Sequence, residues 1–192
     1  LEVAKHGQIT LTSIVMTAGF VKNVNGDLGN YNMEVKDFYC KVDINLNQNE
    51  RDELYQIAQH SNFEPYLIEK DNAPDNNHVT EAELLPNWFK EKAKDFLKVG
   101  WPVFLKNKGE VPWHTDDKRK SSMTFQLNAS ETPTIFRNDV GYAWTLHHNL
   151  GVYLQNNQQE HSVPKSSKDR FFLQISFDKP YNEIREMLKH DI

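Results

Sequence analysis

Cysteine is nearly absent from this sequence of 192 residues, in which Cys40 is the only one. A single cysteine excludes an intramolecular disulfide and a zinc cluster of thiolates, so the chain does not need an oxidising compartment. Long apolar runs are also missing, because no segment approaches the roughly 18 residues that cross a bilayer. Glu2 and Lys5 interrupt the stretch in which a signal peptide would be continuously apolar. We therefore expect a cytoplasmic protein with no membrane partner.

Basic residues are not in excess. Lys and Arg number 22 against 27 Asp and Glu, which gives a formal net charge of −5. Nucleic-acid-binding surfaces need a basic patch or stripe, so we expect no nucleic-acid partner. The 38% hydrophobic and 26% charged residues are ordinary for a globular protein. The length predicts a single domain over residues 1–192, and the oligomeric state is left open.

The pattern of apolar residues predicts helices first and then a series of short strands. Before residue 100 it indicates β-rich runs at 9–20 and 33–46, helices at 49–60 and 81–99, and a loop at 71–78. After residue 100 it indicates strands at 101–106, 121–128, 134–137, 143–147, 151–156 and 171–177, and a C-terminal helix at 180–190. This order favours a mainly β fold with supporting helices, specifically a double-stranded β-helix of the jelly-roll or cupin type. The β-helix core is expected at 100–178, with the elements of 1–99 packed on it.

Two of the expected strands have one apolar face and one unusually polar face. The polar side chains are Ser122, Thr124 and Gln126 in one strand, and Arg170 and Gln174 in the other. A polar face can point to solvent, or into a barrel that holds a polar ligand. For Gln126 and Gln174 both interpretations stay open, whereas the spacing of Arg170 from His161 favours the barrel interior.

A possible metal site is spread over two parts of the sequence. His114 and Asp116 form an H-x-D pair, and His161 supplies a second imidazole further along. Two imidazoles and one carboxylate on one face of a metal leave three coordination positions open, as non-haem Fe(II) requires. An H-x-D pair alone is weak evidence, because the chain has eight His and 27 acidic residues. Arg170, nine residues after His161, adds a fork for a carboxylate near the metal.

This ordered set resembles the 2-oxoglutarate- and Fe(II)-dependent dioxygenase superfamily over residues 98–178. The resemblance implies that His114, Asp116 and His161 hold Fe(II), and that Arg170 pairs with the distal carboxylate of 2-oxoglutarate. Ser122 and Thr124 are candidates for further donors to that carboxylate. The implied activity is hydroxylation of a C–H bond, coupled to oxidative decarboxylation of 2-oxoglutarate to succinate.

The subfamily and the substrate are less defined. The segment His161-Ser162-Val163-Pro164, followed by Asp169-Arg170-Phe171-Phe172, looks like the prolyl and aspartyl/asparaginyl hydroxylase branches. The resemblance therefore implies a peptide, an amino acid or a small molecule as substrate. Trp113–Lys120, Asn138–Trp144 and elements from the first 80 residues are expected to surround the mouth of the barrel.

Several alternatives compete with this interpretation. His147 and His148 form another histidine pair, but their spacing from Arg170 is too long for one strand, so we interpret both as surface or rim residues. Arg119 is interpreted as part of a solvated turn or as a substrate contact. Arg119 and Arg137 are the next candidates for binding the carboxylate. At the level of function, a non-catalytic cupin-like binding protein and a metal-dependent isomerase or hydrolase on the same barrel remain open.

Overall fold

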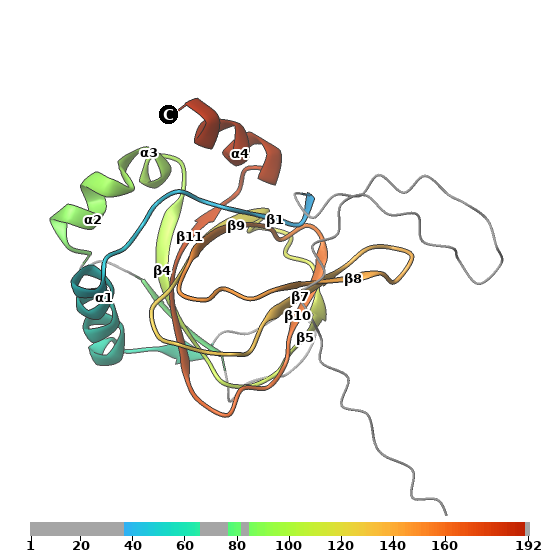
Figure 1. Ribbon diagram of the computed structural model, residues 1–192, viewed down its shortest axis with the longest axis horizontal. Helices are drawn as coiled ribbons and strands as arrows, with labels where there is room; N and C mark the ends of the chain where they lie inside the picture. Colours follow the sequence, from blue (N-terminus) through green and yellow to red (C-terminus); the bar gives the residue numbers. More distant parts are fainter. Residues whose placement is uncertain (1–36, 66–76, 82–84, 191–192) are drawn as a thin grey trace, which may run out of the picture. The chain divides into compact units, whose positions relative to one another are not determined.

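Eleven strands in two antiparallel sheets make up most of the described structure, which is a computed structural model (Figure 1). The structure describes residues 37–65, 77–81 and 85–190, all within one compact unit, Glu34–Ile192. The expected β-rich run at 9–20 lies outside these residues. The single domain over 1–192 accordingly stays a prediction.

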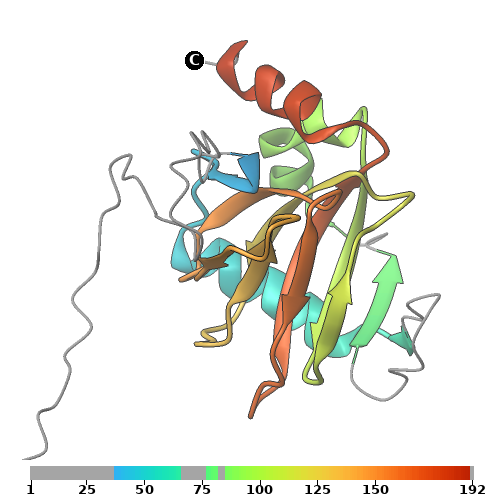
Figure 2. The same cartoon turned by 90° about the vertical axis from the view of Figure 1, so that its right-hand side faces the viewer.

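The larger sheet has seven strands in the order β1-β9-β6-β11-β4-β3-β2 (Figure 2). Their bounds are β1 Tyr39–Lys41, β2 Glu64–Pro65, β3 Asn77–Glu81, β4 Trp101–Asn107, β6 Ser121–Gln126, β9 Val152–Asn156 and β11 Arg170–Phe177. The smaller sheet has the order β5-β10-β7-β8, with β5 Val111–His114, β7 Thr134–Arg137, β8 Ala143–Leu146 and β10 Glu160–Val163. The two sheets oppose each other, so the expected double-stranded β-helix is confirmed (Figure 1).

The helices bury the apolar face of two neighbouring strands of the larger sheet, β6 and β11. They are α1 Gln48–His60, α2 Asn87–Lys92, α3 Lys94–Leu97 and α4 Tyr181–His190. The apolar face of β6 and β11, which includes Phe125 and Leu173, shares one core cluster with Leu54 of α1, Phe89 of α2 and Ile184 of α4. Burying each such side chain contributes about 1.5–3 kcal/mol. The polar face of the same strands is left to point between the two sheets.

Helix α1 confirms the expected helix at 49–60 and begins one residue earlier. Asn47 caps it, because its side chain accepts a hydrogen bond from the Glu50 amide at 3.0 Å, while the Glu50 carboxylate accepts one from the Asn47 amide at 2.9 Å. This reciprocal pair is a capping box.

The expected helix at 81–99 is wrong as one element. Glu81 ends β3, and the first helical residue is Asn87, directly after Pro86. At Ala93 the backbone leaves the helical region, with φ −110° and ψ 15°, which separates α2 from α3. The expected loop at 71–78 is also wrong at its end, since Asn77 and His78 belong to β3.

The sequences of strands β5 and β10 do not alternate between apolar and polar residues, so the sequence pattern does not predict these two strands. Both have only four residues. They nevertheless position the two histidines of the candidate metal site.

No helix in the described part of the chain is long and apolar enough to cross a membrane.

Candidate metal centre and ligand cavity

The three residues predicted to hold a metal lie together at one edge of the smaller sheet. His114 ends β5 and is the register partner of His161 in β10. Asp116 follows two residues after β5, and its amide donates to the Asn157 carbonyl at 3.0 Å. One ligand atom from each of the three lies within 4.8 Å of the others. Three atoms this close all lie within about 3 Å of one point, near the reach of a metal ion.

Backbone carbonyls determine which imidazole nitrogens can bind a metal. The Nδ1 atoms of His114 and His161 lie 2.8 Å from the Pro112 carbonyl and 2.9 Å from the Gln159 carbonyl. Because a carbonyl only accepts, Nδ1 carries the proton in each ring and Nε2 keeps its lone pair. Those Nε2 atoms lie 3.8 and 4.0 Å from the oxygens of Asp116.

The charge state of His161 also suits a ligand. Burial, followed by the neighbouring His114, lowers the pKa of His161 to about 4. The ring is therefore neutral at neutral pH, as metal coordination requires. No other group of three or more metal-ligating side chains comes together among the described residues. Two imidazoles and a carboxylate form a nitrogen and oxygen donor set that fits Fe(II).

Arg119 contacts the carboxylate of this group. Its Nε and Nη2 atoms donate to Asp116 Oδ2 at 2.9 and 2.7 Å, and its Nη1 donates to Gln174 Oε1 at 2.6 Å. The interpretation of Arg119 as part of a solvated turn is wrong, because its side chain is only 16% exposed and borders the cavity described next. The role as a substrate contact stays a prediction.

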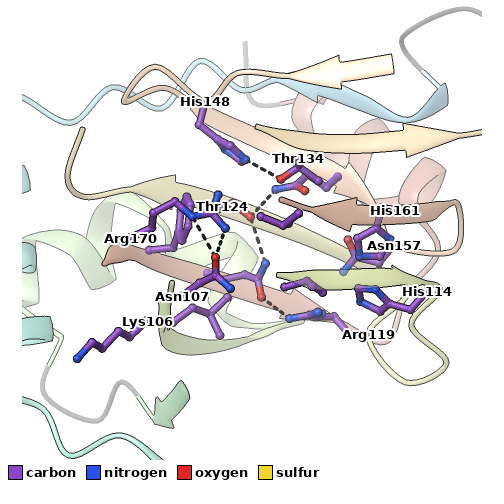
Figure 3. A pocket seen from close by; sticks show the side chains of 16 residues that line it. Lys106, Asn107, His114, Arg119, Thr124, Thr134, His148, Asn157, His161 and Arg170 are labelled. Carbon is purple, nitrogen blue, oxygen red and sulfur yellow. Dashed lines mark hydrogen bonds between the residues drawn. The ribbon is translucent and has the colours of Figure 1, made fainter. Parts of the chain in front are cut away.

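A cavity of about 110 Å³ extends from His114 and His161 to Arg170 (Figure 3). Figure 3 shows the two histidines and Asn157 at one end and Arg170 with Asn107 at the other. Leu105, Val111, Val163 and Phe172 also line it. The cavity thus joins a candidate metal centre to a buried cation.

Arg170 is buried, with 2% of its surface exposed, as its expected position inside the barrel requires. Its Nε donates to Asn107 Oδ1 at 3.0 Å, its Nη2 donates to the same oxygen, and its Nη1 donates to the Thr132 carbonyl at 3.1 Å. Two of the five N–H groups of a guanidinium remain after these three bonds. No carboxylate in residues 37–65, 77–81 or 85–190 forms an ion pair with it. Burial lowers the pKa of Arg170 to about 10, so the group is still charged at neutral pH.

Thr124 is placed to donate into the cavity that it lines. Its Oγ1 accepts hydrogen bonds from Gln155 Nε2 at 2.8 Å and from Gln174 Nε2 at 3.2 Å. Both acceptor positions of the hydroxyl are then used, which leaves its own proton to donate. Gln174 and Gln126 are both buried, so the interior interpretation holds for the two glutamines.

Ser122 lies on the same face of β6, but its contacts differ from those of Thr124. The Ser122 hydroxyl donates to Asn157 Oδ1 at 3.2 Å. It thereby orients the amide of Asn157 beside the metal-ligating residues. A direct bond from Ser122 to a carboxylate stays a prediction.

The interpretation of His148 as a surface or rim residue is wrong, whereas His147 is exposed as expected. His148 is 3% exposed and lines the cavity, with Nε2 3.2 Å from Thr134 Oγ1. Adjacent residues of an extended chain point to opposite sides, so one histidine of a pair is turned inward when the other faces solvent. This alternation in the sequence could have predicted that one of the two histidines is buried.

Asn107 and Asn157 are site residues that the sequence does not indicate. Asn107 is the register partner of Arg170 across β4 and β11. Asn157 is buried in the turn between β9 and β10. A lone asparagine is common in turns and at strand ends, so neither position carries a signal of its own.

Trp113, expected at the mouth, and Arg137, a further candidate for binding the carboxylate, form a contact outside the cavity lining. The Arg137 guanidinium lies 4.2 Å from the centre of the Trp113 ring and donates to Glu160 at 2.5 Å. Arg137 is therefore engaged elsewhere, and Trp113 remains 37% exposed beside the first candidate ligand.

No protein-family model and no curated protein matches this sequence. Solved structures do match the fold. One is a prolyl hydroxylase from Trichoplax adhaerens in complex with a hypoxia inducible factor oxygen degradation domain peptide fragment, with a TM-score of 0.59 at 10% identity over 77% of this chain and 87% of that one. Another is a prolyl-4-hydroxylase from Pseudomonas putida, with a TM-score of 0.55 at 12% identity over 73% of this chain and 91% of that one.

A third is an oxidoreductase of the 2OG-Fe(II) oxygenase family from Burkholderia pseudomallei, with a TM-score of 0.50 at 10% identity over 67% of this chain and 77% of that one. These likenesses show that the chain has the double-stranded β-helix fold found in 2-oxoglutarate- and Fe(II)-dependent oxygenases.

Proposed function

We propose that this protein is a 2-oxoglutarate- and Fe(II)-dependent oxygenase that hydroxylates a C–H bond. The observation that carries the proposal is the buried guanidinium of Arg170, which lines one cavity together with His114 and His161, two members of the candidate metal-binding group. A buried charge without an opposite charge is costly, so its position calls for an anionic ligand. A five-carbon 2-oxo dicarboxylate has a metal-chelating end and a distal carboxylate, which match the two ends of the cavity.

The residues of the chain would share the work of binding and orientation. The Nε2 atoms of His114 and His161 and the carboxylate of Asp116 would hold the metal on one face. Arg170 would form charge-assisted hydrogen bonds with the distal carboxylate, and Thr124 would donate to the same ligand. The apolar side chains that line the cavity would exclude water from the reacting end.

When bound, Fe(II) would supply the oxidative chemistry, in which dioxygen, 2-oxoglutarate and a C–H bond become carbon dioxide, succinate and an alcohol. A shorter 2-oxo acid would leave the Arg170 guanidinium without a partner, which provides selection for the dicarboxylate.

Two other functions fit the same barrel less well. A non-catalytic cupin-like protein, or a metal-dependent isomerase or hydrolase, has no specific need for a buried guanidinium at the far end of the metal cavity. The binding of 2-oxoglutarate separates these candidates from an oxygenase, and the formation of succinate separates the catalytic from the non-catalytic case.

We further propose a peptide or amino-acid side chain as the substrate. Two observations support this choice: the likeness to a prolyl hydroxylase in complex with a peptide fragment, and the net charge of −5, which disfavours a phosphate backbone. Exposed Trp113 lies next to His114, where an apolar ring can contact a peptide.

The test begins with an anaerobic titration of the Fe(II)-loaded protein with 2-oxoglutarate, followed by measurement of succinate in air. Binding of about one equivalent together with succinate formation is expected. A panel of peptides and amino acids should then raise succinate output, and methylated oligonucleotides should not. Absence of 2-oxoglutarate binding would reject the proposed activity, while stimulation by methylated oligonucleotides alone would reject the proposed substrate class.

A further inference from the structure

Two buried side-chain nitrogens lack a hydrogen-bond partner within the described part of the chain, and both belong to residues that line the cavity. They are His148 Nδ1 and Asn157 Nδ2. Buried polar atoms are nearly always paired in folded proteins, so an unpaired one indicates a missing partner such as a ligand. Asn157 lies at the metal end, whereas His148 lies near Arg170, whose charge affects its titration.

The backbone next to His148 is held in a costly conformation. Asn149 and Leu150 have φ values of 46° and 59°, and they are the only residues other than glycine with positive φ in the part of the chain that the structure describes. Leucine adopts this left-handed region only with strain. The Gly151 amide closes the turn on the His148 carbonyl at 2.7 Å, and the Leu150 amide donates to Gln126 Oε1 at 3.3 Å. Strain of this kind persists where the surroundings fix a functional position.

We propose that His148 is a specificity-determining residue that donates a hydrogen bond to the distal carboxylate of the co-substrate, beside Arg170. This inference rests on the proposed function. Thr134 Oγ1 lies 3.2 Å from Nε2, and in the proposed arrangement this hydroxyl donates to Nε2, which leaves the ring proton on Nδ1, the atom that lacks a partner. Arg170 supplies the charge, and His148 supplies a neutral donor of fixed direction.

Packing keeps the imidazole in one orientation. The Phe172 ring lies 5.3 Å from the His148 ring between centres, and the Tyr153 ring meets it edge-on at 5.7 Å. Burial, followed by the charge of Arg170, lowers the pKa of His148 to about 3, so the ring donates without adding a second buried charge. A neutral donor next to a guanidinium recognises the shape of a carboxylate at little electrostatic cost.

The experiment compares two ligands on the full chain loaded with Mn(II) under anaerobic conditions. One ligand is 2-oxoglutarate, and the other is 2-oxobutyrate, which has the same chelating end but no distal carboxylate. Dissociation constants come from titration calorimetry, with competition for the weaker ligand. We expect His148→Phe to weaken 2-oxoglutarate binding by about 10- to 100-fold, the effect of a lost hydrogen bond to a charged group, and to leave 2-oxobutyrate binding within about twofold.

Conservative variants separate a hydrogen bond from a general effect on packing. The amide nitrogen of His148→Asn can replace Nδ1, so this variant should recover most of the affinity, whereas His148→Gln, which mimics Nε2, should not. The exposed neighbour provides the control, because His147→Phe should bind both ligands like the parent protein.

The outcomes distinguish this inference from the proposed function. A parent protein that binds no 2-oxoglutarate overturns both. A parent protein that binds it, with His148→Phe unchanged or equally weakened for both ligands, overturns the role of His148 alone.

Discussion

Arg119 donates two hydrogen bonds to a single oxygen of Asp116, at 2.9 and 2.7 Å, and Asp116 Oδ1 lies on the side of His114, 3.8 Å from its Nε2. The guanidinium thus fixes the carboxylate through Oδ2, which itself lies 4.0 Å from His161 Nε2, while Oδ1 faces His114. Partners of this kind orient metal ligands, and their loss typically lowers metal affinity about 10- to 100-fold.

Replacing Arg119 tests this orientation. In Arg119→Gln the carboxylate loses both bonds and can rotate away from the histidines, so we expect metal affinity to fall about 10- to 100-fold. A Mn(II) titration followed by electron paramagnetic resonance measures it, with Lys118→Gln as the exposed neighbouring control. Unchanged affinity in Arg119→Gln would mean that the backbone bond from Asp116 to Asn157 is enough to hold the carboxylate.

The metal centre itself is tested by removing one imidazole. His161→Ala deletes a ligand from a group of three, so stoichiometric Fe(II) binding should be lost in an anaerobic titration. His147→Ala, which removes an exposed histidine, should bind iron like the parent protein. Retention of one tightly bound Fe(II) by His161→Ala would reject the assigned ligands.

Arg170→Lys tests the anion site without removing the charge. Lysine lacks the planar fork and cannot keep the bonds to Asn107 and Thr132 while it binds a ligand. We expect the affinity for 2-oxoglutarate to fall by about 1–3 kcal/mol, with metal affinity unchanged. The matched control is Arg137→Lys, because the Arg137 guanidinium of the parent protein pairs with Glu160 outside the cavity lining. Equal 2-oxoglutarate affinity in Arg170→Lys and the parent protein would place the carboxylate elsewhere.

Burial of His148 predicts a specific loss of stability in acid. Its pKa is about 3 in the folded protein and near 6.5 when exposed, so between these values only the unfolded chain binds the proton. The contribution of His148 to the free energy of unfolding is therefore at its maximum above pH 6.5, the pKa in the unfolded chain. It decreases as the pH falls from about 6.5 towards 3, and the loss is about 2 kcal/mol at pH 5.

The measurement is urea unfolding of the metal-free protein at pH 7.5 and pH 5. His148→Asn has no titrating group at this position, so its free energy of unfolding should decrease by about 2 kcal/mol less than that of the parent protein. Subtracting the two proteins removes the contribution of His161, which titrates in both. Identical pH dependence would show that His148 takes up protons in the folded state.

Local patterns in the sequence were enough to predict the strand-rich half of the fold and the identity of the candidate ligands. The strands from β6 onward that alternate or carry β-branched and aromatic residues were found within one or two residues, because the pleat repeats every two residues. The set of His114, Asp116, His161 and Arg170 could be recognised because the four residues occur together in one order, whereas the H-x-D pair alone is weak evidence.

The short strands and the lining of the cavity were decided by tertiary structure. Strands β5 and β10 have four residues each and are extended because they pair with each other, which brings His114 opposite His161. Asn107 reaches Arg170 through the register of β4 with β11, and register is a property of two strands that neither sequence contains alone.

His148 shows most clearly which properties the sequence determined and which the tertiary structure decided. The sequence determined that a histidine pair exists there, and the spacing led us to separate it from the candidate metal ligands. The sequence left open whether His147 or His148 faces the interior, and the structure buries His148, directly before the left-handed turn at Asn149 and Leu150. The sequence by itself thus determined the chemistry available to this protein, and only the packing of two sheets decided which side chains meet in one cavity, because those contacts join residues far apart in the chain.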